Sequence, residues 1–217
     1  MKPINKEIYI LGVGHNTIVY IDLVEACGYS IKGLYHYNND RVGQNVHGYP
    51  IIDTTENLLK KTSLSGNFYA ISVGDNEIRT QLANRIREKG GNVPTLIHPT
   101  AVVSRFSEIE EGVVIHINSV VQGDTLIKQD TVLSYNSSVS HNSQLGKGCY
   151  LAANSIVGAY VNVGEKVLIG ISSILVSAKA NLIGKNSIIG AGSVVINNVD
   201  ENSIVAGNPA KELYKKK

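Results

Sequence analysis

An aliphatic side chain recurs at every sixth position along the second half of the chain, from Ile97 to Leu175. Neither a helical period of about 3.6 residues nor the two-residue period of an ordinary strand produces this spacing. Three positions after most of these aliphatic residues stands Gly, Asn or Asp, the types that most readily adopt a left-handed backbone. Each hexad therefore predicts a short strand followed by a corner, and the repeat as a whole predicts a parallel β-helix.

Three hexads complete one triangular coil, so residues three hexads apart stack along the helix axis. The aliphatic positions are Ile97, Val103, Ile109, Ile115, Val121, Ile127, Leu133, Val139, Leu145, Leu151, Val157, Val163, Ile169 and Leu175. Asn118, Asn136 and Asn154 fall above one another at one corner. They are either a ladder of paired amides or corner residues chosen for their backbone conformation, and the sequence leaves both interpretations open.

The six-residue pattern slips once and then stops. It resumes at Ile183 after an insertion that predicts a bulge or small loop at residues 177–181. Beyond Asn197 it ends, and residues 202–211 (NSIVAGNPAK) predict an extended segment that caps the last coil. A repeat fold needs such a cap because an open sheet edge would otherwise pair with other chains.

The first half of the chain alternates strand and helix patterns. Strands are predicted at residues 7–11, 31–37, 46–52, 68–73 and 93–97, and helices at 18–27, 54–61 and 78–89. This order is typical of an α/β, Rossmann-like domain. We therefore predict two domains: a Rossmann-like domain at residues 1–96 and an all-β parallel β-helix domain at residues 97–217.

A glycine-rich turn, residues 12–17 (GVGHNT), joins the first strand to the first helix. Such a helix N-terminus favours anions. The dinucleotide fingerprint is incomplete, because Thr17 replaces its third glycine and no acid follows the second strand to hold a ribose. An NAD-dependent oxidoreductase is therefore disfavoured, whereas another phosphorylated ligand fits. A second turn, residues 74–77 (GDNE), is expected to face the same crevice.

Composition narrows the class of protein. The chain has 217 residues, 43% of them hydrophobic and 18% charged, and a net charge of +2, which gives no reason to expect nucleic acid. Cys27 and Cys149 fall in different predicted domains, which fits a reducing compartment better than a disulfide. The N-terminus lacks an apolar signal-peptide core, and no apolar run reaches the roughly 18 to 20 residues that span a bilayer. We expect a cytoplasmic protein without membrane insertion.

Three histidines lie in the repeat. His98 and His116 are three hexads apart and should stack, which could begin a zinc site, but a third ligand is missing and we expect no metal. His141 lies two positions after Val139, near a corner where its ring can point outward. A neutral imidazole there can accept a proton near pH 7, as a general base must. An exposed polar residue without a catalytic role is the alternative.

With these residues in view, the chain resembles the NeuD/PglD family of sugar acetyltransferases, which join a small Rossmann-like domain to a left-handed parallel β-helix. The resemblance covers nearly the whole chain. The matching stretches are IYILGVGH at residues 8–15, ISVGDNEIR at 71–79, LIHPTAVVS at 96–104, NSSVSH at 136–141 and GNPAK at 207–211. The hexads alone are shared by many acyltransferases, whereas the two-domain order with GVGH and GDNEIR is much more specific.

The resemblance implies acetyl transfer from acetyl-CoA to the amino group of a nucleotide-linked 4-amino-4,6-dideoxy sugar in bacterial glycan biosynthesis. It makes His141, with Asn142 beside it, the general base, and the backbone N–H of Ala159 the donor to the oxyanion. It implies a homotrimer with acetyl-CoA in the groove between neighbouring β-helices, near Gly170 and Gly190. The substrate-binding residues that we expect are Gly14, His15, Tyr37, Asn76 and Asn136.

The chain departs from the family pattern at three places that bear on chemistry, and one of them is Tyr150, which stands where the prototype has another histidine. Asn142 stands where the family usually has Glu or Asp after the histidine, so we expect a less basic ring at His141. The acidic pair often found after the second strand is replaced by residues 35–38 (YHYN), which leaves the nucleotide and the sugar open. An O-acetyltransferase acting on sialic acid or a polysaccharide precursor, and a non-catalytic ligand-binding scaffold, are the alternative functions.

Overall fold

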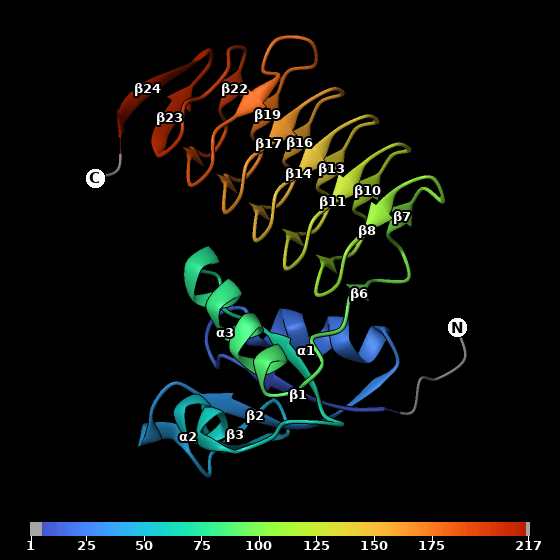
Figure 1. Cartoon of the computed structure of the whole chain (residues 1–217), viewed down its shortest axis with the longest axis vertical. Coiled ribbons are helices and arrows are strands. Elements are labelled where there is room, and N and C mark those ends of the chain that lie inside the picture. The colour runs from blue at the N-terminus through green and yellow to red at the C-terminus, as the bar shows by residue number, and fades with distance from the viewer. Residues whose placement is uncertain (1–5, 216–217) are drawn as a thin grey trace. The chain divides into compact units, whose positions relative to one another are not determined.

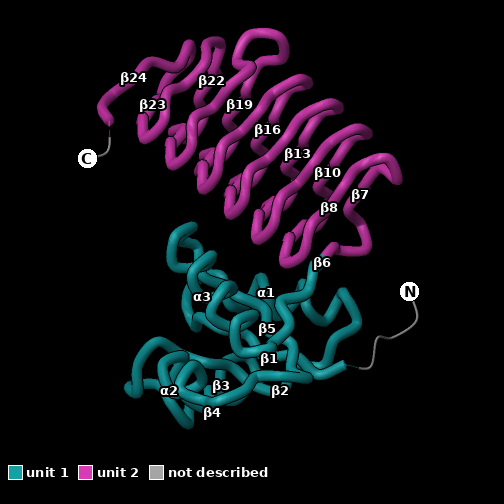
Figure 2. Tube along the Cα trace, viewed as in Figure 1, with its two compact units in different colours: residues 1–96 teal, residues 97–217 magenta. Residues whose placement is uncertain are grey.

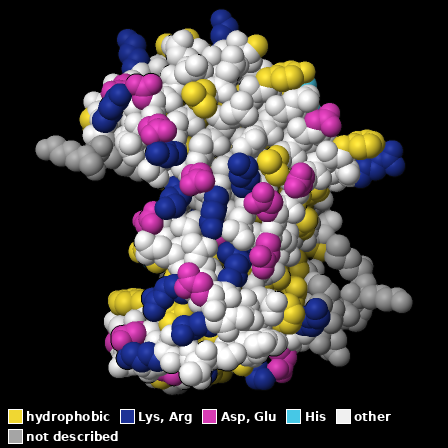
Figure 3. All heavy atoms as spheres, in the orientation of Figure 1, with side chains coloured by type: hydrophobic (Ala, Val, Ile, Leu, Met, Phe, Trp, Pro, Cys, Tyr) yellow, Lys and Arg dark blue, Asp and Glu magenta, His cyan; other side chains and the backbone are white. Residues whose placement is uncertain are grey.

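The computed structural model describes residues 6–215, and the chain divides into two compact units between Leu96 and Ile97 (Figure 2). Unit 1 holds the helices, and unit 2 holds a long series of two-residue strands (Figure 1). On the face drawn in Figure 3, Lys and Arg side chains are interspersed with Asp and Glu in both units. Among residues 6–215, no helix is both long and apolar enough to cross a membrane.

Unit 1 is a five-stranded sheet in the order β3-β4-β2-β1-β5, parallel except for the β3–β4 hairpin. Its elements are β1 (Lys6–Leu11), α1 (Thr17–Ala26), β2 (Tyr29–His36), the 3₁₀ turn η1 (Asn39–Arg41), β3 (Asn45–Val46), β4 (Tyr49–Thr54), α2 (Thr55–Lys60), β5 (Phe68–Ile71) and α3 (Asn76–Glu88). Strand β1 lies between β2 and β5, so the turn that follows it stands beside the turn after β5 at the carboxyl edge of the sheet.

Both faces of this sheet are covered. Ile10 and Leu11 are adjacent on β1 and point to opposite faces, yet neither is exposed to solvent. Leu58 and Leu59 of α2 pack with Ile86 of α3 in the same apolar cluster as Leu11. Burial on both faces explains why the strands read as continuous apolar runs rather than alternating ones.

Polar side chains start two of the helices. The Thr54 hydroxyl accepts a hydrogen bond from the Asn57 N–H at 3.1 Å and so caps α2. The Asp75 carboxylate accepts one from the Ile78 N–H at 2.9 Å and caps α3. These caps satisfy helix N–H groups that have no partner within the helix. They also fix where α2 and α3 leave the carboxyl edge of the sheet.

Unit 2 is a three-sided parallel β-helix in which each strand pairs with the third strand before and after it, as Val120 pairs with Val102 and Ser138. One side is β7-β10-β13-β16-β19-β22, the second is β8-β11-β14-β17-β20, and the third runs from β6 through β9, β12, β15, β18 and β21 to β23 and β24. The strands are β6 (Leu96–Ile97), β7 (Val102–Val103), β8 (Glu108–Ile109), β9 (Val114–Ile115), β10 (Val120–Val121), β11 (Leu126–Ile127), β12 (Val132–Leu133), β13 (Ser138–Val139), β14 (Gln144–Leu145), β15 (Tyr150–Leu151), β16 (Ile156–Val157), β17 (Asn162–Val163), β18 (Leu168–Ile169), β19 (Ile174–Leu175), β20 (Leu182–Ile183), β21 (Ile188–Ile189), β22 (Val194–Val195), β23 (Ser203–Gly207) and β24 (Ala210–Lys215).

The six-residue repeat builds both the core and the corners of unit 2. The second residue of each strand points inward, and from Ile115 to Val195 these side chains are at most 3% exposed and form one cluster. The residue three positions later has a positive φ, as at Asn118, Asn136 and Asn154, where φ is 57° to 58°. One amide of the predicted Asn ladder is paired: Asn136 Nδ2 donates to Asn154 Oδ1 at 3.2 Å.

The structure adds to or corrects the sequence prediction in four local details. Residues 46–52 are not one strand but a hairpin of β3 and β4, because His47 and Gly48 both adopt positive φ and turn the chain. Of residues 93–97, only β6 is a strand, and it pairs with β9 of the repeat. The insertion forms a turn in which the N–H groups of Lys179 and Ala180 donate to the carbonyl of Val176. The cap is an antiparallel hairpin of β23 and β24, whose first strand extends the third side.

Candidate functional site

The turn after β1 is closed by the residue that breaks the dinucleotide fingerprint. Thr17 is 1% exposed, and its hydroxyl accepts a hydrogen bond from the Gly14 N–H at 2.7 Å and donates to the Gly12 carbonyl at 3.2 Å. Gly12 has φ of 97°, which a residue with a side chain rarely adopts. A threonine therefore holds the turn by hydrogen bonds where the fingerprint uses a third glycine for close packing.

The turn after β5 is hydrogen-bonded to the turn after β1. The Ser72 N–H donates to the Leu11 carbonyl at 2.8 Å, and its hydroxyl donates to the Gly12 carbonyl. Arg79, 3% exposed, lies behind this turn and donates to the carbonyls of Val73 and Gly74 at 3.4 and 3.3 Å. The two turns thus form one polar edge, as the sequence predicts.

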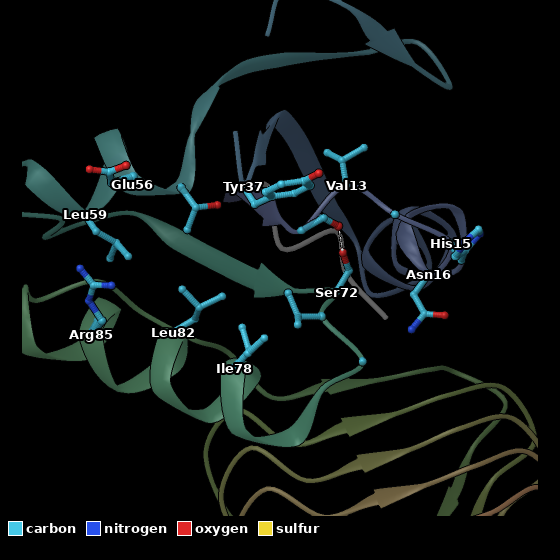
Figure 4. A pocket seen from close by; sticks show the side chains of 15 residues that line it. Val13, His15, Asn16, Tyr37, Glu56, Leu59, Ser72, Ile78, Leu82 and Arg85 are labelled. Carbon is cyan, nitrogen blue, oxygen red and sulfur yellow. Dashed lines mark hydrogen bonds between the residues drawn. The ribbon is translucent and has the colours of Figure 1, made fainter. Parts of the chain in front are cut away.

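A cavity of about 650 Å³, called the crevice from here on, opens at this edge of unit 1. It is bounded by both turns, by Tyr37 after β2, and by side chains of α2 and α3 (Figure 4). The lining residues are Gly12, Val13, Gly14, His15, Asn16, Tyr37, Thr55, Glu56, Leu59, Ser72, Val73, Gly74, Ile78, Leu82 and Arg85. A concave apolar site with a few polar groups is the usual form of a small-ligand site.

The crevice brings together three of the five expected substrate residues. Gly14, His15 and Tyr37 line it, and the Tyr37 side chain is 73% exposed. Asn76 is not among the lining residues, and its side-chain oxygen accepts a hydrogen bond from Arg79 at 2.9 Å. Asn136 belongs to unit 2, at the corner that carries the Asn pair.

Several crevice residues were not predicted from the sequence. Asn16 lies in the glycine-rich turn and could have been found there. Glu56 and Arg85 stand on the exposed sides of α2 and α3, where charged residues are ordinary. Only the strand order, which sets α2 and α3 beside one edge, shows that these two side chains share a cavity with the turns.

In unit 2, His141 stands exposed at a corner with its ring held on two sides. Its Nδ1 lies 2.8 Å from Asn142 Oδ1, and its ring packs edge-on against Tyr160 at 5.5 Å between ring centres. An amide oxygen only accepts hydrogen bonds, so Nδ1 carries the proton and donates. In the neutral ring, the other nitrogen, Nε2, then carries no proton and can accept one from a substrate.

The remaining expected residues of unit 2 have clear structural surroundings. The Ala159 N–H donates to the Ser177 hydroxyl at 2.8 Å. The N–H groups of Gly170 and Gly190 donate to the carbonyls of Ile189 and Val205 in the next coil. A Cβ added at Gly170 would lie 2.6 Å from the Ala191 nitrogen, so packing between coils already accounts for that glycine.

His116, stacked near His98, differs from His141. Its side chain is 5% exposed, and burial lowers its pKa to about 4, with a smaller effect from the charge of His98. A ring that remains neutral at pH 7 in the core is typical of a structural histidine. Among the described residues, no group of three or more His, Cys, Asp or Glu side chains is arranged to hold a metal ion.

The comparisons with known proteins agree with this architecture. The model of the PglD N-terminal domain family matches residues 7–86. The solved structure of PerB from Caulobacter crescentus, in complex with CoA and GDP-perosamine, is 28% identical, covers 97% of this chain and 98% of its own, and superposes with a TM-score of 0.85. The chain is therefore similar to NeuD/PglD-like sugar acetyltransferases over nearly its whole length.

Two further matches are also to acetyltransferases. The acetyltransferase domain of PglB from Neisseria gonorrhoeae, in complex with acetyl coenzyme A, is 26% identical, with a TM-score of 0.63 over 96% of this chain and all of that one. UDP-N-acetylbacillosamine N-acetyltransferase from Bacillus subtilis is 47% identical over 47 residues, a match that spans 22% of each protein. The predicted fold class, a Rossmann-like α/β domain followed by a left-handed parallel β-helix, is confirmed.

Proposed function

We propose that this protein transfers the acetyl group of acetyl-CoA to the amino group of a nucleotide-linked amino sugar, with His141 as general base. The observation that carries the proposal is the exposed His141 ring, whose Nε2 is left free to accept a proton by the contact between Nδ1 and Asn142. The full-length similarity to PerB, solved with CoA and GDP-perosamine, supports both the reaction and the kind of substrate.

The proposed reaction uses the unprotonated Nε2 of His141 as the proton acceptor. The amine attacks the thioester carbonyl, and Nε2 of His141 takes the proton that the nitrogen loses. The tetrahedral oxyanion then expels the sulfur of coenzyme A, which leaves as a thiol after taking up that proton. An orienting partner contributes by keeping the ring in the tautomer that accepts, and Asn142 does this without adding charge.

The oxyanion requires a donor beside the reacting carbonyl. The Ala159 N–H is suited to this role, and its present bond to the Ser177 hydroxyl marks a position where an oxygen atom fits. A thioester oxygen bound there would displace that hydroxyl. A donor already oriented toward developing charge contributes about 3 to 4 kcal/mol to such reactions.

The crevice of unit 1 binds the nucleotide in this proposal, with Gly14, His15 and Tyr37 in contact with it. Assembly as a homotrimer, with coenzyme A beside Gly170 and Gly190, is part of the same proposal. It is supported by the exposed apolar side chains of Ile156 and Ile174, which stand on the outer face of the paired strands β16 and β19. We place the enzyme in the cytoplasm, where acetyl-CoA is made, in bacterial glycan biosynthesis.

The test is a transfer assay with acetyl-CoA and 4-amino sugars linked to different nucleotides, followed by mass spectrometry of the product. We expect His141→Ala to lower kcat by about 10²- to 10⁴-fold, which is what general base catalysis contributes, while coenzyme A binding is unchanged. His98→Ala, a histidine substitution elsewhere in the repeat, is the matched control and should retain activity.

Three results would overturn parts of this proposal. An unchanged rate in the His141→Ala variant would remove His141 as the base. Acetylation of hydroxyl groups in place of the amine would favour an O-acetyltransferase, and ligand binding without turnover would favour a scaffold. Sedimentation or light scattering tests the trimer separately.

A further inference from the structure

The crevice of unit 1 has two polar ends separated by an apolar middle (Figure 4). His15 and Asn16 stand at one end, and Glu56 and Arg85 stand at the other. Between them lie the side chains of Ile78 and Leu82, with the ring of Tyr37, and Leu59 stands beside Glu56 and Arg85. An elongated ligand with an anionic group at one end and a hydrogen-bonding ring at the other would complement this shape.

The end at His15 and Asn16 suits phosphate. It immediately precedes α1, a helix of 10 residues, and the backbone N–H groups of His15 and Asn16 donate to no described residue. Unpaired N–H groups at a helix N-terminus favour a negative charge. A nucleoside diphosphate placed with its phosphates here extends its base toward Glu56 and Arg85.

The opposite end presents an acceptor and a donor together. Arg85 is exposed, and its guanidinium makes no hydrogen bond to any described residue. Its positive charge attracts the Glu56 carboxylate at the same end of the crevice. Glu56 also pairs with Lys60 at 2.7 Å, which holds the pKa of Glu56 below its usual value. That pair is fully exposed, and such pairs contribute so little that a ligand readily replaces them.

We propose, on the basis of the function proposed above, that Glu56 and Arg85 read the nucleotide base and select guanine. The N1–H and the 2-amino group of guanine are adjacent donors, which the two oxygens of one carboxylate can accept together. Its O6 and N7 are adjacent acceptors, which match the guanidinium fork. Guanine therefore satisfies both side chains, and the exposed ring of Tyr37 provides an apolar surface beside it.

The other bases satisfy this pair less completely. Uracil and thymine have one N–H between two carbonyl oxygens, so a carboxylate that accepts the N–H also meets a repelling oxygen. Cytosine and adenine each have one exocyclic amino group and no second donor beside it. The selectivity therefore depends on the 2-amino group and N1–H of guanine at Glu56, and on O6 and N7 at Arg85.

The test is isothermal titration of the full-length protein with GDP, IDP, UDP, dTDP, CDP and ADP. We expect GDP to bind at least about 10-fold more tightly than the pyrimidine nucleotides, since a good bidentate contact discriminates by about 5- to 150-fold. IDP lacks only the 2-amino group and should bind about 10-fold more weakly than GDP. Glu56→Gln should remove most of the preference for GDP over IDP, and Arg85→Gln should weaken both.

Lys60→Gln is the matched control, because Lys60 pairs with Glu56 but does not line the crevice. It should leave the order of affinities unchanged. Tighter binding of UDP or dTDP than of GDP, or an equal loss for every nucleotide in Glu56→Gln, would overturn guanine selection while leaving the acetyltransferase proposal intact. Absence of binding by all six nucleotides would overturn both the guanine selection and the nucleotide-sugar substrate.

Discussion

Unit 1 and unit 2 place functional side chains by different means. In unit 2, the position of a residue in the hexad decides whether it is buried, turned or exposed, so His141 stands at a corner because it comes two positions after the buried Val139. In unit 1, the crevice is assembled from turns and helices that are far apart in the sequence. A periodic fold fixes the chemistry of single positions, whereas a layered fold creates concave space between segments.

The same contrast holds for buried titratable groups. Unit 1 buries tyrosines, and burial raises the pKa of Tyr69 to about 12 and raises that of Tyr35 as well. Both rings are therefore neutral throughout the acid range. Unit 2 buries His116, whose pKa burial lowers to about 4. Acid should therefore protonate the ring of His116 in unit 2 and leave the rings of Tyr35 and Tyr69 in unit 1 unchanged.

The largest expected effect follows from this difference. His116 binds a proton in the unfolded chain below its ordinary pKa of about 6.5 but in the folded chain only near 4. The unfolded state therefore binds more protons between these values, and the free energy of unfolding of unit 2 should fall by about 3 kcal/mol as the pH drops from 7 to 4. Urea unfolding at a series of pH values measures this change in the free energy of unfolding. Hydrogen exchange of the backbone amides reports it for each unit separately.

The variant His116→Gln sharpens this prediction because glutamine does not titrate. Its unit 2 should lose the histidine-dependent part of the pH slope, while His98→Gln, the matched control at the neighbouring coil, should retain most of it. An identical slope in wild type and His116→Gln would show that other groups carry the acid sensitivity.

Glycines provide the second contrast between the units. A Cβ added at Gly158 would lie 2.5 Å from the Ser177 hydroxyl and 2.6 Å from the Leu175 carbonyl oxygen. At Gly14, no atom lies within 4 Å of the added Cβ. We expect Gly158→Ala to lower the free energy of unfolding by about 1 to 3 kcal/mol through overpacking, and Gly14→Ala to change it by less than about 0.5 kcal/mol.

Urea unfolding of both variants measures this pair, and nucleotide titration adds a second comparison. Gly14→Ala should still weaken nucleotide binding, because its methyl group would occupy the crevice. Equal destabilisation by the two substitutions would mean that both glycines are required for packing, which would contradict the difference proposed between the two units.

The sequence predicted unit 2 almost completely, because each hexad repeats one structural requirement. Val139 and Leu151 are predicted to be buried and neither is exposed. The left-handed corner conformation also occurs at residue types that do not favour it: Tyr160 and Ala178 adopt φ of 60° and 58°. Stacking on the preceding coils, rather than local preference, imposes the corner there.

In unit 1, the turns were predictable but the crevice was not. Glycine spacing predicts the turn at Gly14, since few other residues fit between a strand and a helix in this way. Nothing local marks Glu56 or Arg85, because their meeting depends on strand order. Asn76 is not among the residues that line the crevice, and its side-chain oxygen accepts a hydrogen bond from the buried Arg79, a contact that no sequence pattern indicates.

The smallest expected effect decides why asparagine occupies one corner of unit 2. Asn136 has φ of 57° and pairs with Asn154 at 3.2 Å, but both side chains are exposed. An exposed hydrogen bond exchanges with water and contributes little, whereas a left-handed backbone costs alanine about 1 kcal/mol. We therefore expect Asn136→Ala to lose about 1 kcal/mol of unfolding free energy, and Asn136→Gly, which accepts the backbone but lacks the amide, to lose less than about 0.5 kcal/mol. Urea unfolding of the two variants measures the difference, and a glycine variant as unstable as the alanine variant would show that the amide pair, not the backbone, selects asparagine.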